Sequence, residues 1–200
     1  EAVSVIFSRA VSEKSVNKGR FRRLALLLPL LLSIGLFTEC AALSSEPERI
    51  TEEEALEAEA VLNEEDDDWL LIRKKQKRLF VLRNRKVIRS YAVATGVNDG
   101  QKQKPGDGRT PEGVFKVLQI QNASYWTHDF RDGKGEIKGA YGPWFIRLKT
   151  PWRGIGIHGT HDPRSIGKNA TEGCIRLRNE ELKDLKEKYI KLSMVVVIRK

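Results

Sequence analysis

The chain has 200 residues and a formal net charge of +9, with 36 basic and 27 acidic side chains. This length allows one domain with tails. The charge is uneven, since positions 43–68 hold twelve acidic residues and one basic residue, whereas positions 69–200 hold 29 basic and 12 acidic residues. A basic segment favours an anionic polymer as partner, but the chain has no helix-turn-helix, zinc-finger or RNA-recognition motif, which argues against nucleic acid.

The first 42 residues contain a candidate export segment. A basic run at 20–23 precedes an apolar stretch at 24–37, and Cys-Ala-Ala follows at 40–42. The apolar stretch is short for a bilayer span, which needs about 20 residues. A basic flank, a short apolar core and small residues after it are typical of a secretory signal. We therefore predict export to the periplasm or cell envelope, with lipidation of Cys40 and an uncleaved membrane anchor as alternatives.

An acidic segment follows at 43–68. Ser45 can cap a helix and Pro47 suits a first helical turn, and the Glu and Ala residues up to Leu62 favour helix. The like-charge block at 64–68 repels itself and is typical of a flexible link. We predict an acidic helical tether that joins the export segment to a domain at 69–200.

From residue 69 the pattern changes to short runs of alternating, β-branched and aromatic residues, which predicts strands. Turn-forming residues at 96–108 predict a loop, and 122–138 a surface insertion. Asn179 can cap a helix whose apolar face would carry Leu182, Leu185 and Tyr189. The predicted fold is mainly β with one helix near the C-terminus. Its strands are expected at 69–73, 79–82, 86–95, 114–121, 141–148, 155–157 and 193–199.

The candidate chemistry lies at 153–179. Cys174 follows Gly173, and His158 ends the predicted strand before it. A thiol needs a base to become a nucleophile at neutral pH, and histidine is the usual base. Arg176 adds a cation that favours the thiolate and suits a substrate carboxylate. Spacing alone leaves two other interpretations open, which are a buried Cys and a core His.

A metal site built from His158, His161 and Cys174 is less favoured. The spacing of the two histidines suits one face of a helix, but Gly159 and the Asp-Pro pair at 162–163 indicate a loop. His161 is expected to be a solvated loop residue.

These residues resemble the catalytic motif of the YkuD-type L,D-transpeptidases. That motif is a histidine-glycine pair, a spacer, and then Ser or Thr, any residue, Gly-Cys and usually Arg. The matching text is IHGT at 157–160, SIG at 165–167 and TEGCIR at 171–176. Thr-Pro-x-Gly at 110–113 and Gly-Pro-aromatic at 142–144 are also similar to the family. The resemblance covers about 69–200.

The resemblance implies a YkuD-like β-sandwich or open barrel of mixed strands, with one C-terminal-side helix packed on it. It implies an acyltransferase that cross-links peptidoglycan stem peptides through a thioester on Cys174, with His158 as the base. No cofactor or metal is implied. An L,D-carboxypeptidase or a wall-protein anchoring transferase would use the same pair. A non-catalytic basic domain that binds the wall, or its anionic polymers, is the alternative from another class.

Further site residues follow from the motif. Backbone N–H groups near Gly173 and Cys174 are expected to hold an oxyanion. By resemblance, Gly159 or Thr160 would orient the imidazole through a backbone carbonyl, and Arg176 would be an electrostatic helper or a contact for a substrate carboxylate.

Aromatic residues of two segments are candidate substrate contacts. By resemblance these are Tyr141 and Trp144, and also Tyr125 and Trp126 of the insertion at 122–138. Many members carry His directly before the Gly-Cys pair, where this chain has Glu172. The difference leaves His158 as the sole expected base.

Overall fold

A computed structural model describes residues 49–62, 68–130, 133 and 135–200. The predicted export segment with Cys40, the predicted cap at Ser45 with Pro47, and residues 64–67 of the acidic block lie outside these ranges. Within the described ranges, no helix is long and apolar enough to cross a membrane.

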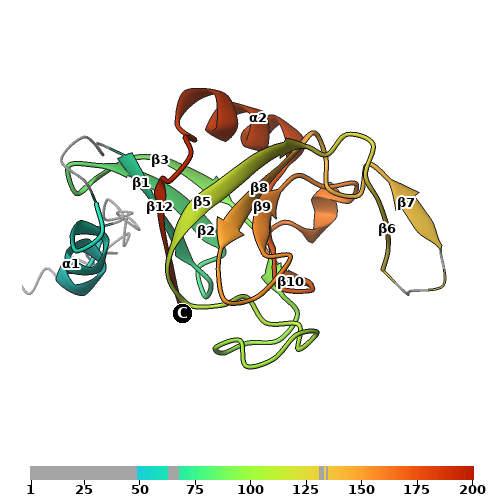
Figure 1. Cartoon of the computed structure of the whole chain (residues 1–200), viewed down its shortest axis with the longest axis horizontal. Helices are drawn as coiled ribbons and strands as arrows, with labels where there is room; N and C mark the ends of the chain where they lie inside the picture. Colours follow the sequence, from blue (N-terminus) through green and yellow to red (C-terminus); the bar gives the residue numbers. More distant parts are fainter. Residues whose placement is uncertain (1–48, 63–67, 131–132, 134) are drawn as a thin grey trace, which may run out of the picture. The chain divides into compact units, whose positions relative to one another are not determined.

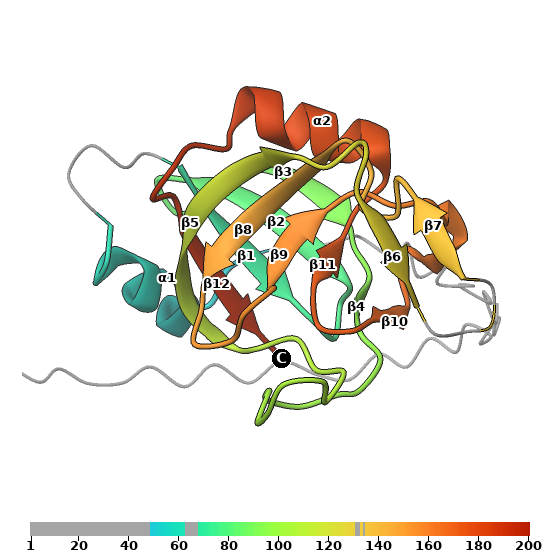
Figure 2. The ribbon, with the colours of Figure 1, turned by 45° about the vertical axis from the view of Figure 1, so that its right-hand side comes forward.

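One curled mixed sheet dominates the described part of the chain (Figures 1 and 2). Two neighbouring pairs, β1–β12 and β9–β11, run parallel, and the other neighbours in the sheet run antiparallel. The predicted mainly β fold is therefore confirmed. In order across the sheet the strands are β11 (Ile175–Arg176), β9 (Gly156–His158), β8 (Trp144–Lys149), β5 (Gly113–Asn122), β12 (Val195–Arg199), β1 (Asp68–Arg73), β2 (Arg78–Arg83) and β3 (Lys86–Ala92).

The C-terminal-side helix is α2 (Asn179–Lys188), and it packs on the sheet as predicted. Leu182 and Leu185 are fully buried in the main core cluster. The predicted cap is wrong, however, because Arg178 occupies the N-cap position and makes no side-chain cap hydrogen bond. The Asn179 side chain is used for a contact within the candidate site.

Both faces of β1 are buried, which explains its continuous apolar run. Leu70 and Ile72 belong to the main core cluster. Trp69 and Leu71 point to the opposite face, where they belong to a second cluster with Phe80. Side chains alternate across a strand, so a sheet that is covered on both faces requires apolar residues at every position.

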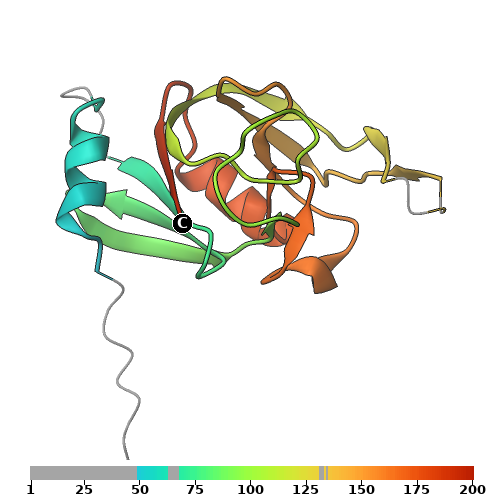
Figure 3. The same cartoon turned by 90° about the horizontal axis from the view of Figure 1, so that it is seen from below.

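The second cluster is covered by α1 (Glu52–Glu59) (Figure 3). Thr51 caps the helix and forms a reciprocal capping box with Glu54. Ala58 is fully buried, and the Glu54 carboxylate accepts two hydrogen bonds from Arg73, at 2.8 and 2.6 Å. The helix is shorter than the one predicted at 44–62. It is also packed on the sheet and does not behave as a free tether there.

A loop and a hairpin extend from the sheet near the predicted catalytic residues. The first is the loop at 97–112, where Lys102 and Asp107 form a buried ion pair with Nζ and Oδ1 2.6 Å apart. It follows β4 (Thr95–Gly96), which pairs in parallel with β10 (Asn169–Thr171). The second is the hairpin of β6 (Thr127–Asp129) and β7 (Glu136–Lys138), which lies in the predicted insertion.

Candidate active site

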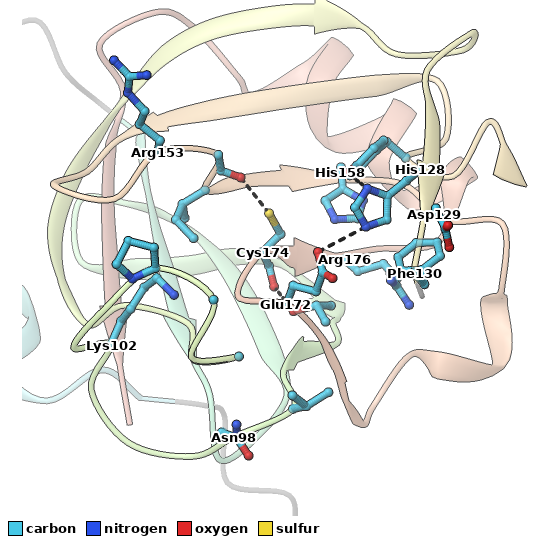
Figure 4. A pocket seen from close by; sticks show the side chains of 18 residues that line it. Asn98, Lys102, His128, Asp129, Phe130, Arg153, His158, Glu172, Cys174 and Arg176 are labelled. Atoms are coloured by element: carbon cyan, nitrogen blue, oxygen red, sulfur yellow. Dashed lines mark hydrogen bonds and ion pairs between the residues drawn. The ribbon is translucent and has the colours of Figure 1, made fainter. Parts of the chain in front are cut away.

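A cavity of about 640 Å³ opens between the loop, the hairpin and the ends of β9 and β11 (Figure 4). Its lining contains four predicted site residues, which are Tyr141, His158, Cys174 and Arg176, and it also contains Glu172. The curled sheet accounts for this grouping. His158 on β9 and Arg176 on β11 are register partners, and Cys174 directly precedes β11.

The His158 imidazole is held on three sides. Its Nδ1 atom lies 2.6 Å from the Gly159 carbonyl oxygen, which can only accept, so Nδ1 carries the proton. The Phe145 ring is stacked on the imidazole with an angle of 4° between the planes, and the Tyr141 ring meets it edge-on at 5.0 Å. This tautomer leaves the Nε2 lone pair as the proton acceptor.

Burial keeps the His158 imidazole uncharged. The side chain is 3% exposed, and desolvation, followed by the nearby Arg176 cation, lowers its pKa to about 3. The hydrogen bond to Gly159 acts in the opposite direction and is outweighed. At neutral pH, His158 is therefore a neutral base.

Cys174, the cysteine within the described residues, is a free thiol. Its Sγ donates to the Gly154 carbonyl at 3.1 Å. Desolvation raises the pKa of the thiol to about 11, although the Gly156 backbone N–H and Arg176 favour the thiolate. The thiol and the imidazole are thus both neutral at rest, and the thiol hydrogen-bonds to Gly154 and not to the imidazole.

Gly173 has a backbone conformation that side chains rarely adopt. Its φ is +134°, and a Cβ atom there would lie 2.7 Å from the Arg109 carbonyl oxygen. The Gly173 N–H donates to Thr171 Oγ1 at 3.2 Å. Because this donor is already engaged, it does not match the role of oxyanion donor that the sequence predicted. The Cys174 N–H remains the candidate.

Arg176 is a buried cation at the cavity wall, with 5% of its surface exposed. One terminal nitrogen donates to Ser165 Oγ at 3.0 Å, and the guanidinium lies over the Phe130 ring. Within the described residues its Nε has no hydrogen-bond partner. Desolvation lowers the pKa of Arg176. A buried cation at the cavity wall favours negative charge in the cavity.

Sequence reasoning missed one residue that positions His158. Asn179 Oδ1 accepts a hydrogen bond from the Thr160 N–H at 2.7 Å. A Cβ atom added to Gly142 or to Gly159 would lie only 2.2 Å from the same oxygen, which is too close for any side chain. The two glycines therefore let α2 hold the segment that carries the Gly159 carbonyl. Proximity of Asn179 to two glutamates indicated only a helix cap, so no local signal revealed this contact.

Of the two aromatic residues predicted at 141–144 to contact substrate, one faces the cavity and the other faces the core. Tyr141 lines the cavity, whereas Trp144 does not. Trp144 packs against the core cluster and lies under the Lys186 ammonium of α2, 4.4 Å from its ring centre. The physical reason is strand alternation, since the next residue, Phe145, faces His158.

The other aromatic and histidine residues considered from the sequence lie outside the cavity lining. Tyr125 is 90% exposed and, like Trp126, lies outside the cavity lining. Trp126 packs on Tyr141 and Phe145. His161 is exposed in the turn before a short 3-10 helix at Pro163–Ser165. Within the described residues, no three His, Cys, Asp or Glu side chains gather as possible metal ligands.

The fold and the site define a mainly β domain with a thiol–imidazole pair at the wall of an open cavity. The model of the YkuD family, the L,D-transpeptidase catalytic domain, matches residues 67–198. The chain therefore belongs to this family.

Known relatives agree with this assignment. YqjB of Bacillus subtilis, provisionally named an L,D-transpeptidase, is 34% identical over 118 residues, which are 58% of this chain and 62% of YqjB. YkuD of the same organism, with the same provisional name, is 32% identical over 109 residues, which are 54% of this chain and 52% of YkuD. The chain thus spans less than two thirds of the length of these relatives.

Solved structures support the fold alone. An L,D-transpeptidase from Xylanimonas cellulosilytica superposes with a TM-score of 0.51 at 16% identity, covering 70% of this chain and 63% of that one. An L,D-transpeptidase from Mycobacterium smegmatis superposes with a TM-score of 0.50 at 17% identity, covering 68% and 59%.

Proposed function

We propose that this chain is a peptidoglycan L,D-transpeptidase that transfers a stem-peptide acyl group through a thioester on Cys174. One observation carries the proposal. Cys174 shares a cavity with His158, whose tautomer is fixed by the Gly159 carbonyl and whose imidazole is neutral. Such a pair supplies a nucleophile and a base without any further group.

In the acylation step, His158 Nε2 takes the Cys174 proton while the sulfur attacks the donor carbonyl carbon. The C–S bond forms, and the carbonyl oxygen becomes an oxyanion that the Cys174 N–H can stabilise. The C–N bond of the donor then breaks, and His158 returns the proton to the leaving amine. Because thiol and imidazole both start neutral, proton transfer and attack are coupled.

By family membership, the donor is a stem tetrapeptide with an L-centre at its third residue and D-Ala at its fourth. D-Ala leaves, and the rest of the peptide stays on the sulfur. Arg176 is the group for a donor carboxylate, because its guanidinium is a cation at the cavity wall.

The acyl group then passes to an amine of a neighbouring stem peptide, and the thiol is regenerated. We further propose that the protein acts outside the cytoplasmic membrane, since the apolar segment at 24–37 has the pattern of an export signal. The basic domain would bind anionic wall polymers as well as stem peptides. Attachment to the membrane through the N-terminal segment belongs to the same proposal.

The test is an analysis of wall peptides from cells that express the native chain, Cys174→Ala or His158→Ala. The native chain is expected to add L,D cross-links, and both variants are expected to add none. Expression and folding of the variants are checked by thermal melting of the purified proteins. Cross-links that persist with a folded Cys174→Ala variant would contradict the proposal. A rise in tripeptides without cross-links would indicate a carboxypeptidase.

A further inference from the structure

The two ends of the cavity differ in charge. Arg153 lies on one side of Cys174, and Glu172 lies with His128 toward the other (Figure 4). The Glu172 side chain is 67% exposed, so a ligand can reach its carboxylate. Transfer to an amine needs a second substrate that arrives as an ammonium ion, and a carboxylate beside the nucleophile suits that charge.

Glu172 approaches His128 of the hairpin, which in turn contacts Tyr141. His128 Nε2 lies 3.2 Å from Glu172 Oε2, and His128 Nδ1 lies 3.0 Å from the Tyr141 hydroxyl. The Tyr141 ring in turn contacts the His158 imidazole edge-on. A side chain that is held in this way loses less rotamer freedom when a ligand binds, so its contact with a ligand is stronger.

The simpler alternative is that Glu172 only neutralises Arg176. The contacts favour a different arrangement. Glu172 Oε2 lies 3.2 Å from His128 Nε2, a contact that is ionic only when the imidazole is protonated. Arg176 is 5% exposed, donates to Ser165 and lies over Phe130, so it sits in the wall while Glu172 faces the opening.

We propose that Glu172 binds the ammonium group of the acceptor substrate, and that His128 and Tyr141 position its carboxylate. The inference rests on the proposed function. The ammonium ion bound at the exposed carboxylate first loses one proton to water. The resulting amine nitrogen then attacks the thioester carbon. The C–N bond forms and the C–S bond breaks, and His158 carries the second amine proton to the leaving sulfur. The products are an amide and the free thiol.

The experiment compares two acceptors of similar size at pH 7.5. Ethylamine is an ammonium ion at this pH, whereas 2,2,2-trifluoroethylamine is largely uncharged. The enzyme is first acylated with a synthetic stem tetrapeptide, and aminolysis and hydrolysis are measured per acyl-enzyme formed. The variants are Glu172→Gln, His128→Ala and His128→Gln. Glu136→Gln is the matched control, because Glu136 is exposed on β7 and lies outside the cavity lining.

Glu172→Gln is expected to raise the KM for ethylamine roughly three- to fivefold, which is the effect of one solvent-exposed charge pair, and to leave the KM for trifluoroethylamine unchanged. His128→Ala is expected to show part of the same selective effect. His128→Gln, which keeps an N–H donor, is expected to restore the native KM, and the Glu136→Gln control is expected to match the native enzyme.

Equal KM values for ethylamine in the native enzyme and Glu172→Gln would overturn this inference. An equal loss with both amines, or no use of either amine by the acylated native enzyme, would also overturn it. A native enzyme that is not acylated at all would instead refute the proposed function, and this inference would fall with it.

Discussion

Replacing Asn179 with alanine tests whether α2 positions the catalytic base. The variant removes the acceptor for the Thr160 N–H, and Thr160 is 2% exposed. A buried N–H left without a partner costs about 1–3 kcal/mol. For a domain of this size, that cost lowers the melting temperature by about 2–12 °C.

The same change should reduce the chemistry by more than its effect on stability. Thr160 follows the Gly159 carbonyl that fixes the His158 tautomer. A displacement of about 1 Å at a catalytic group can cost roughly 100-fold in rate. We expect the acylation rate of Asn179→Ala to fall by roughly ten- to 100-fold at a temperature where the variant is fully folded.

The two assays are acylation by a synthetic stem tetrapeptide, followed by intact mass, and thermal melting. Asn179→Asp keeps an oxygen acceptor and suits the first turn of a helix, so it should retain most of the rate. Glu180→Ala changes the next residue, whose side chain is 83% exposed, and serves as the control. An Asn179→Ala variant that acylates at the native rate would refute the positioning role.

Two further predictions concern pH and the N-terminal helix. Because the pKa of His158 is lowered to about 3 and that of Cys174 is raised to about 11, the acylation rate should stay flat between about pH 5 and 9; an acid limb near 6.5 would contradict a neutral resting pair. The pKa of Glu54 is lowered, since hydrogen bonds from Arg73 and Thr51 outweigh its desolvation, so Glu54→Gln should cost about 1–2 kcal/mol of unfolding free energy at pH 7 in denaturant titrations. This stabilisation is present above the ordinary pKa of 4.5 and is lost as the pH falls through the lowered value. The difference in unfolding free energy between Glu54→Gln and the native chain should therefore shrink in acid. A difference that stays constant with pH would argue against the ion pair.

Short-range patterns predicted the parts of the fold that depend on neighbours in sequence. The apolar run at 69–73 and the Val-rich run at 193–199 became adjacent parallel strands. The motif around His158 and Cys174 placed both residues at one cavity. These predictions worked because alternation and motif spacing are local properties.

Contacts between distant segments were not predictable in this way. Asn179 and Thr160 are 19 positions apart and meet only because α2 packs beside the end of β9. Glu54 was predicted to lie in a helical tether with no partner in the domain, since its partner Arg73 is supplied by a strand outside the acidic segment. Trp144 was wrongly predicted to contact substrate. Which residues of β8 face the cavity depends on where the strand starts, and a turn at Gly142, with φ +66°, precedes it.

The proposed mechanism requires that Cys174 carries the acyl group. The most direct measurement is the intact mass of the enzyme after brief incubation with a stem tetrapeptide and an acid quench, followed by peptide mapping. We expect one added acyl group on Cys174, with the mass of the tetrapeptide less its released D-Ala, which hydroxylamine removes as expected for a thioester. An acyl group on another residue, or product formation by folded Cys174→Ala, would contradict it.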